Sequence, residues 1–300
     1  MDFNSYQQEA LRTDRVPEDD DAASLIVPML GLAGETGQLL SEYKKHLRDG
    51  EAHRLFKERV SEELGDLLWY IANVASKFDL SLSEIAGANL VKVRHRWTSE
   101  RAEPLVFDAE LPEGERLPRQ FEVELVDAEE REGESQHVQI LIDGEPFGSQ
   151  LTDNAYDPDG YRFHDVFHFA YAAVLGWSPI TRGLLRRKRK SRPLVDEVED
   201  GGRAAVIEEG VVALAFDYAR RHRFLDGVAV LDFQLLRTIK DMTSHLEVCQ
   251  CTTGEWEQAI LQGFEVWRAV LASRGGRIAV DLDLRSIAFL GPPANQEPPV

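Results

Sequence analysis

Carboxylate and amide side chains recur at helical spacing between Gly31 and Asp66. Glu35 and Gln38 are three residues apart, and Glu63 and Asp66 repeat this step in the next apolar stretch. Side chains three or four positions apart share one face of an α-helix. Oxygen ligands gathered from two helices suit a hard divalent cation. The spacing therefore predicts a Mg²⁺ or Mn²⁺ site formed by Glu35, Gln38, Glu63 and Asp66.

The second of these predicted helices is apolar on nearly every side. Its apolar residues are Leu64, Leu67, Leu68, Trp69, Ile71 and Val74. Such a helix is normally buried, so the carboxylates of Glu63 and Asp66 are expected in a dry setting that needs a neutralising cation. Gly34, Gly37 and Gly65 are expected to allow close approach of the two helix backbones. The competing interpretation of a single acidic pair is a solvated helix face.

Three segments carry a family resemblance. GLAGETGQL, EELGDLLWYIA and NLVKVRHRW resemble the MazG-type all-α nucleoside triphosphate pyrophosphohydrolases, over residues 1–100. The family pattern is E-x-x-E, a variable spacer, E-x-x-D and a downstream N-x-x-K. Glu35, Glu63 and Asp66 match it as catalytic and metal-binding residues. The resemblance implies hydrolysis of (deoxy)nucleoside triphosphates to the monophosphate and pyrophosphate, and assembly as a dimer or tetramer.

The resemblance also covers the downstream element and contains one departure. Asn89 and Lys92 match N-x-x-K, and they are expected to bind substrate phosphates together with Lys44. Gln38 stands where the family has its second glutamate. An amide oxygen can coordinate a metal but brings no charge, so metal affinity or turnover is expected to be lower. Glu42 is a further candidate ligand on the same helix face.

The composition of the chain limits which classes of function are expected. The chain has 300 residues, enough for two domains, and a net charge of -19, which opposes general binding to nucleic acids and anionic membranes. Cys249 and Cys251 are the two cysteines, too few for a disulfide framework, so a reducing cytoplasm is expected. We expect neither a signal peptide nor a membrane-spanning segment.

The expected fold class is mainly α. We expect an all-α helical bundle in residues 1–104, a proline- and acid-rich linker in 105–120, and a second, mostly helical domain in 121–290. The second domain is expected to begin with a short antiparallel β meander that turns at Asp143-Gly144, because its segments alternate apolar and polar residues. A strand-like segment follows Gly275-Gly276, and residues 291–300 are expected to be a disordered tail.

The second domain contains another group of residues that could do chemistry. His164 and His168 lie four apart in an aromatic, apolar helix, with Asp165 beside the first, and Glu208 and Glu209 begin a later apolar helix. Two imidazoles on one helix face and a facing carboxylate could form a metal or acid/base site. The alternative is a pair of core histidines hydrogen-bonded to buried acids.

A basic segment, TRGLLRRKRKSR, is unusual in so acidic a chain. It could bind the phosphates of a small ligand, or it could be a solvated helix end balanced by the acidic run that follows. Two further functions stay open beside the hydrolase. The first domain could sense a nucleotide with weakened catalysis because of Gln38. The second domain could be a separate metal-dependent hydrolase or effector that uses His164, His168 and Glu208.

Overall fold

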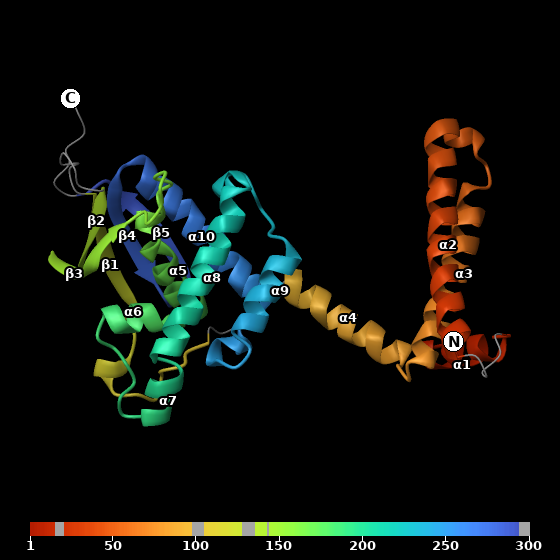
Figure 1. The fold of residues 1–300 in the computed structure, drawn as a ribbon, viewed down its shortest axis with the longest axis horizontal. Helices are drawn as coiled ribbons and strands as arrows, with labels where there is room; N and C mark the ends of the chain where they lie inside the picture. Colours follow the sequence, from red (N-terminus) through yellow and green to blue (C-terminus); the bar gives the residue numbers. More distant parts are fainter. Residues whose placement is uncertain (16–20, 98–104, 128–135, 143, 294–300) are drawn as a thin grey trace. The chain divides into compact units, whose positions relative to one another are not determined.

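The computed structural model describes residues 1–15, 21–97, 105–127, 136–142 and 144–293. These residues form two compact units, Met1–Arg94 and His95–Val300, drawn in Figure 1. The border lies inside one helix, α4, whereas the sequence predicts a boundary after residue 104. Most elements are helical and one small antiparallel sheet is present, in agreement with the predicted mainly α class. None of the helices in the described residues is long and apolar enough to cross a membrane.

Unit 1 contains four α-helices and one 3-10 turn among its described residues. They are α1 (Phe3–Arg12), α2 (Asp21–Asp49), η1 (Gly50–Ala52), α3 (Phe56–Lys77) and α4 (Leu82–Trp97). Helices α2 and α3 pack along each other, and α1 packs against α3. The Gln7 side chain ties α1 to the α3–α4 junction: its amide nitrogen donates to Ser76 Oγ and to the Leu80 carbonyl, and its oxygen accepts from the Leu82 amide.

The close approach between α2 and α3 occurs at a different glycine from those predicted. A Cβ atom on Gly31 would lie 2.2 Å from the ring of Tyr70, so only glycine leaves room for this side chain. Gly34, Gly37 and Gly65 have no described atom within 4 Å of such a Cβ position. The prediction that these three glycines bring α2 and α3 together is therefore wrong within one chain.

Unit 1 buries little apolar surface by itself. Its buried apolar cluster, within the described residues, contains Ala10, Ala72, Ala75 and Leu82. On α3, Leu64 is 51% exposed and Ile71 is 41% exposed, so the prediction of a buried helix is not met in a single chain. The cause is the absence of a covering element on that side among the described residues of this unit.

Unit 2 is built on a five-stranded antiparallel sheet in the order β3-β2-β1-β4-β5. The strands are β1 (Gln120–Asp127), β2 (His137–Ile142), β3 (Glu145–Thr152), β4 (Gly275–Asp281) and β5 (Ser286–Gly291). The predicted meander forms β1 to β3, although Asp143 of its expected turn lies outside the described residues. The strand-like C-terminal segment pairs with the other edge of β1, from Gln120 opposite Asp281 to Val126 opposite Gly275.

Helices cover one face of this sheet (Figure 1). The helices of unit 2 are η3 (Tyr161–Phe163), α5 (Asp165–Leu175), α6 (Pro179–Leu184), α7 (Pro193–Val198), α8 (Gly202–Arg220), η4 (Arg223–Leu225), α9 (Phe233–Met242), η5 (Glu247–Gln250) and α10 (Thr253–Ala272). Of these, α5 and α10 make the main contacts with the sheet. All residues of α5 are buried, because α5 packs against the sheet, α10 and α8. The core of the unit therefore surrounds the helix that carries His168.

The segment predicted to be a linker is packed, whereas most of the predicted tail lies outside the described residues. Residues 105–120 were expected to be a linker, yet Leu111 is 3% exposed and Leu117 is 1% exposed. The prolines and acids of this segment are typical of a linker, but Leu117 belongs to the core of unit 2. In the expected tail, 291–300, Pro293 is buried, and the residues beyond it lie outside the described part of the chain.

Candidate functional site

The three acidic residues of the predicted cation site lie together. Glu35 on α2 faces Glu63 and Asp66 on α3, and one oxygen from each carboxylate lies within 4.8 Å of the others. The three-residue step on α3 places both of its carboxylates toward α2, as the helical period requires. An all-oxygen set of this kind fits Mg²⁺ or Mn²⁺.

Glu63 is the buried member of this group, with 8% exposure, whereas Asp66 is exposed. Burial raises the pKa of the Glu63 carboxyl, and the nearby carboxylates of Glu35 and Asp66 raise it further. Negative charge is therefore unfavourable at this position unless a cation compensates it. This unfavourable charge is what a bound divalent cation would relieve.

Gln38 contacts this acidic group through a hydrogen bond to Glu35 and adds no charge to it. Its side chain is exposed, and its amide nitrogen donates to Glu35 Oε2 at 2.8 Å. A donor in this place holds one oxygen of Glu35 in position. Gln38 thus acts on the site through Glu35 in this arrangement.

Three further predicted residues of unit 1, Glu42, Lys44 and Asn89, do not join the group. Glu42 is buried and pairs with Lys45 and with His53 at 3.3 Å. Lys44 on α2 and Asn89 on α4 are exposed. Lys92 belongs to α4, but its side chain lies outside the described residues.

The second predicted group also comes together, at the start of α5. His164 precedes the first residue of α5, and His168 lies in its first turn. His164 Nδ1 donates to the Tyr161 carbonyl at 2.9 Å, and His168 Nδ1 lies 2.9 Å from Glu208 Oε1. Because a carboxylate and a carbonyl only accept, each ring carries a proton on Nδ1 and directs Nε2 into the site.

Glu208 and Glu209 have different surroundings on α8. Glu208 is fully buried and also accepts hydrogen bonds from Ser178 Oγ at 2.6 Å and from the Ile180 amide at 2.9 Å. The side chain of Glu209 is 43% exposed, and its two oxygens lie 3.5 Å from His168 Nε2 and 3.9 Å from His164 Nε2. Glu208 therefore orients an imidazole, while Glu209 faces both ring nitrogens.

The carboxylates control the charge of this site. Burial alone would lower the pKa of His168, but Glu208, Glu209 and Asp165 outweigh it and raise that pKa to about 10. The contact of His168 Nε2 with Glu209 Oε1, at 3.5 Å, lowers the pKa of Glu209 despite partial burial. The Asp165 carboxylate lies 3.3 Å from His164 Nε2, at the edge of the site. The predicted alternative, histidines bonded to buried acids, describes His168 and Glu208 but not Glu209.

Family comparison adds to this geometry. A family model described as "MazG C-terminal domain" matches residues 102–293.

The chain belongs to the MazG C-terminal domain family.

The chain is also similar to the Gene 37 protein of Mycobacterium phage L5, with 35% identity over 101 residues, which covers 32% of this chain and 89% of the phage protein. No solved structure matches the chain.

The MazG C-terminal domain covers residues 102–293, the part of the chain for which the sequence motifs indicated no family. The prediction that the MazG relationship is limited to residues 1–100 is therefore wrong. His164, His168 and Glu209 all lie inside the matched range. The MazG-like relationship of the chain is confirmed, whereas the hydrolase resemblance of residues 1–100 lies outside that range and stays a prediction. The chain thus has one candidate site within the matched domain and one before it.

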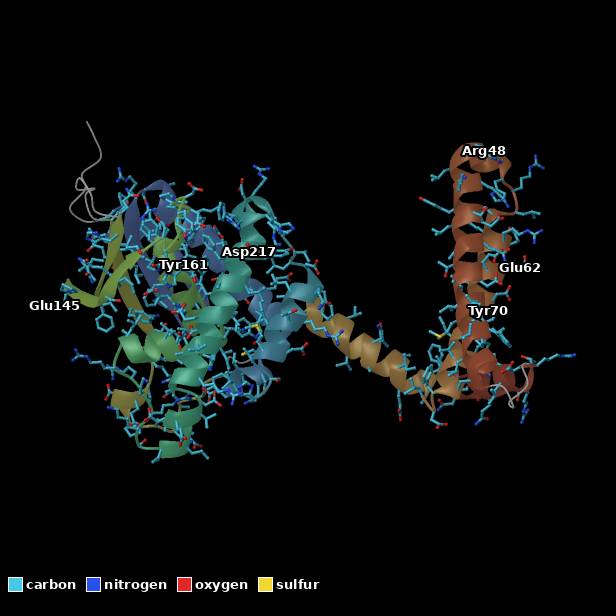
Figure 2. The ribbon with its side chains drawn as sticks, viewed as in Figure 1. Arg48, Glu62, Tyr70, Glu145, Tyr161 and Asp217 are labelled. Atoms are coloured by element: carbon cyan, nitrogen blue, oxygen red, sulfur yellow. The ribbon has the colours of Figure 1, made fainter. Side chains whose placement is uncertain are left out.

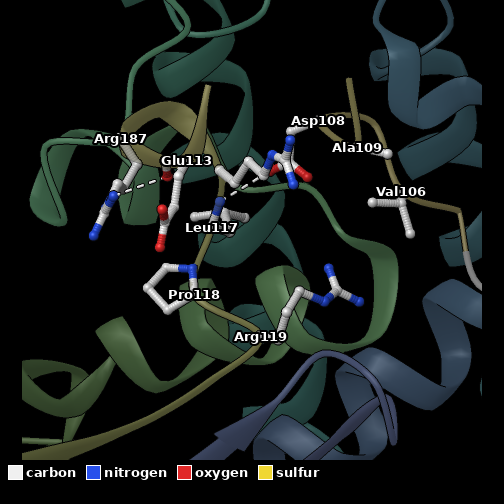
Figure 3. Close-up of a pocket in the computed structure, with 9 residues that line it drawn as sticks. Val106, Asp108, Ala109, Glu113, Leu117, Pro118, Arg119 and Arg187 are labelled. Atoms are coloured by element: carbon white, nitrogen blue, oxygen red, sulfur yellow. Dashed lines mark hydrogen bonds between the residues drawn. The ribbon is translucent and has the colours of Figure 1, made fainter. Parts of the chain in front are cut away.

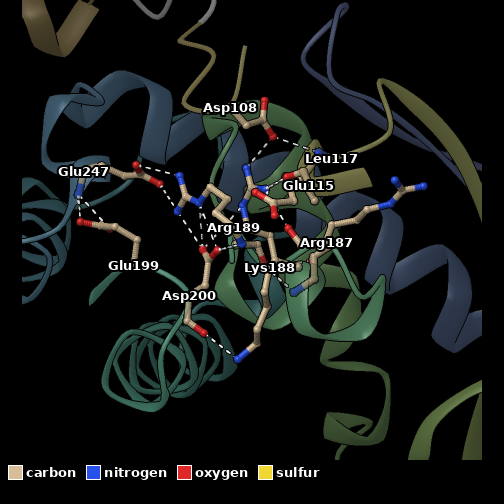
Figure 4. Close-up of polar contacts among 12 residues, drawn as sticks. Asp108, Glu115, Leu117, Arg187, Lys188, Arg189, Glu199, Asp200 and Glu247 are labelled. Atoms are coloured by element: carbon tan, nitrogen blue, oxygen red, sulfur yellow. Dashed lines mark hydrogen bonds and ion pairs between the residues drawn. The ribbon is translucent and has the colours of Figure 1, made fainter. Parts of the chain in front are cut away.

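The basic segment of the MazG C-terminal domain is largely structural (Figure 4). Arg182 and Arg189 are each 1% exposed. The Arg189 guanidinium pairs with Asp200 at 2.8 Å and with Glu247 at 2.7 Å, and Arg182 pairs with Asp108 at 2.6 Å. These two guanidinium groups are committed to buried carboxylates, so the predicted phosphate contact does not apply to them.

A pocket that the sequence did not signal lies in the same domain (Figure 3). Its volume is about 660 Å³, and Val106, Pro118 and Arg119 help to line it. Arg187 closes one side, where its guanidinium donates to the Glu113 carbonyl at 3.0 Å. Most of its lining comes from the segment predicted to be a linker, which explains why no motif indicated it.

Proposed function

We propose that unit 1 hydrolyses (deoxy)nucleoside triphosphates to the monophosphate and pyrophosphate, with Mg²⁺ or Mn²⁺ bound by Glu35, Glu63 and Asp66. The observation that carries this proposal is the convergence of these three carboxylates within 4.8 Å. The motif resemblance of residues 1–100 and the MazG relationship of the chain support it.

Each residue has a defined part in this proposal. The cation would neutralise polyphosphate charge and activate a water molecule. Glu35 and Glu63 bring carboxylates from two helices to one point, and Gln38 holds Glu35 through its hydrogen bond. Lys92, with Asn89 and Lys44, would contact the phosphates, because triphosphate carries more negative charge than one divalent cation neutralises.

We also propose that unit 1 works as a homo-oligomer, either a dimer or a tetramer. One face of α2 carries an exposed stripe at steps of three, four or seven residues: Ile26, Leu30, Ala33, Gly37, Leu40 and Leu47. This is the spacing of a helix face that packs on another helix. A unit with so small a buried cluster is marginal alone, and an exposed apolar stripe marks an interaction surface. A second copy of the same stripe would bury it, and Gly37 would then allow close backbone approach between copies.

The test measures pyrophosphate release with Mg²⁺ across ribo- and deoxynucleoside triphosphates. We expect release by the wild type and a loss of at least about 100-fold in Glu63→Ala, because a ligand of the charge-neutralising cation is removed. Glu62→Ala is the matched control: Glu62 is the preceding residue on α3, labelled in Figure 2, and it pairs with Arg59 on the exposed surface. Equal release by Glu63→Ala and Glu62→Ala would refute the proposal.

The hydrogen bond from Gln38 to Glu35 favours one second candidate, a nucleotide-sensing domain with weakened catalysis. An amide at this position leaves the site with one negative charge fewer than a second glutamate would provide. Nucleotide binding without release by the wild type, together with release by Gln38→Glu, would establish this second function in place of the first. The MazG C-terminal domain would then be the effector.

A further inference from the structure

Two helices of the MazG C-terminal domain bring nitrogen and oxygen ligands to one point. One ligand atom each from His164, His168 and Glu209 lies within 4.8 Å of the other two. We propose that these residues bind a divalent transition-metal ion of the Zn²⁺ type. This site is independent of the cation site in unit 1 and of the proposed triphosphate hydrolysis.

Both imidazoles of this group are fixed in orientation by hydrogen bonds. The Nδ1 atoms of His164 and His168 are engaged, at 2.9 Å each, by the Tyr161 carbonyl and the Glu208 carboxylate. Histidines that bind metal through Nε2 characteristically donate their other N–H to a carboxylate or a backbone carbonyl. The Tyr161 ring, labelled in Figure 2, stacks on the His164 ring with centroids 4.5 Å apart and restrains it further.

One buried nitrogen of the group, His168 Nε2, lacks a hydrogen-bond partner among the described residues. The His168 side chain is fully buried. Glu209 Oε1 lies 3.5 Å away, at the limit of a hydrogen bond. A buried polar atom without a partner is costly, and native structures contain few of them. A metal ion placed between His168 Nε2 and Glu209 would satisfy this atom.

The ligand atoms of the group determine which metal it prefers. Two imidazoles and one carboxylate form a mixed nitrogen and oxygen set, which suits Zn²⁺ and its neighbours in the first transition row better than Mg²⁺. The group in unit 1 offers oxygen only. The two sites should therefore separate by metal preference.

The group is open to solvent on one side. The side chains of His164 and Asp165 are each 8% exposed, whereas that of Glu209 is 43% exposed. The site therefore meets solvent on the side of Glu209. Three protein ligands leave at least one coordination position for water or substrate, as in catalytic rather than structural zinc sites. The alternative is an imidazolium held between Glu208 and Glu209 with no metal.

Co²⁺ replaces Zn²⁺ and reports nitrogen ligation through visible absorption, so it is the probe. The titration uses the full chain with Glu63→Ala, which removes a ligand of the other site. We expect one Co²⁺ per chain with visible absorption, displaced by one equivalent of Zn²⁺ and not by millimolar Mg²⁺. Glu209→Gln and His164→Gln should each weaken binding by at least about tenfold, since each removes a ligand of three.

The matched control is Asp217→Asn, which removes a carboxylate from the same helix, α8, at a half-exposed position labelled in Figure 2. This variant should bind Co²⁺ as its parent does. Circular dichroism of Glu209→Gln verifies the fold, and its half-exposed side chain makes misfolding a small risk. No absorbing Co²⁺ complex in the parent, or equal binding by Glu209→Gln and Asp217→Asn, would overturn the proposal and leave the imidazolium arrangement.

Discussion

The carboxylate of Glu208 lies 2.9 Å from Nδ1 of His168, and both side chains are fully buried. Glu208 has further donors in Ser178 and Ile180, so its position is determined by several contacts. The His168 ring is consequently fixed in one orientation with Nε2 toward Glu209. This pair is what makes the site rigid before any ligand arrives.

Glu208→Gln should weaken Co²⁺ binding by about 10- to 100-fold, although Glu208 does not face the ion, because the orienting carboxylate is lost. The measurement is the Co²⁺ titration described above. Ser178→Ala, which removes one of the hydrogen bonds to Glu208, should have a smaller effect. Unchanged Co²⁺ affinity in Glu208→Gln would show that Glu208 supports the core only.

Glu63→Gln should stabilise the metal-free protein. Burial and the neighbouring carboxylates raise the pKa of Glu63 above its unfolded value. A raised pKa in an acid means that the native state binds the proton more tightly, so stability falls as the pH rises through that pKa. The amide removes this cost, and the melting temperature in EDTA at pH 7 should rise.

Two comparisons test this explanation of Glu63. The gain should shrink as the pH is lowered through the pKa of Glu63, and Glu62→Gln should show no such gain, because its side chain is 58% exposed. Added Mg²⁺ should stabilise the wild type more than Glu63→Gln. A lower melting temperature for Glu63→Gln in EDTA would contradict the prediction.

Leu40→Lys should dissociate the proposed oligomer. Leu40 is 63% exposed on the α2 stripe, and a charge there would be buried without a partner if two copies packed. Size-exclusion chromatography with light scattering gives the mass. Leu284→Lys is the control, at a 76% exposed position of unit 2. A wild type that is monomeric at all concentrations would eliminate the oligomer.

Arg189→Met should destabilise the MazG C-terminal domain by about 3–5 kcal/mol, because it removes the closest cation of the buried Asp200 and leaves it Arg182 at 3.8 Å. Arg192→Met should cost less than about 1 kcal/mol, since Arg192 pairs with Glu110 on the surface. Urea unfolding followed by tryptophan fluorescence compares the two variants. Similar midpoints for both would mean that the buried pairing in Figure 4 contributes little.

The sequence periodicity correctly predicted which side chains share one face of a helix, because this depends only on neighbouring positions in the chain. The three-residue step placed Glu63 and Asp66 on one helix face, and the four-residue step placed His164 and His168 together. Periodicity does not tell which of two adjacent glutamates faces a distant helix. The roles of Glu208 and Glu209 required the register of α8 against α5.

The predictions for the basic segment and for the linker were wrong because the residues concerned pack against partners far away in the chain. Arg182 and Arg189 looked like surface cations because their acidic partners come from separate segments, such as Asp108 and Glu247. Leu117 looked like part of a linker because the other buried residues of its core cluster all come later in the sequence. Such pairings depend on tertiary structure, and no local pattern in one sequence reveals them.

The sheet order has a consequence for synthesis. The central strand β1 pairs with β4, and nearly all of unit 2 separates them in the chain. The chain must therefore be synthesised through β4 before β1 and β4 can pair, while the helices of unit 1 are made earlier and contact one another locally. A chain that stalls before Gly275 would expose an open edge of β1 and the apolar side of α5. Synthesis of β4 thus determines when this edge of β1 is covered and can no longer pair with another chain.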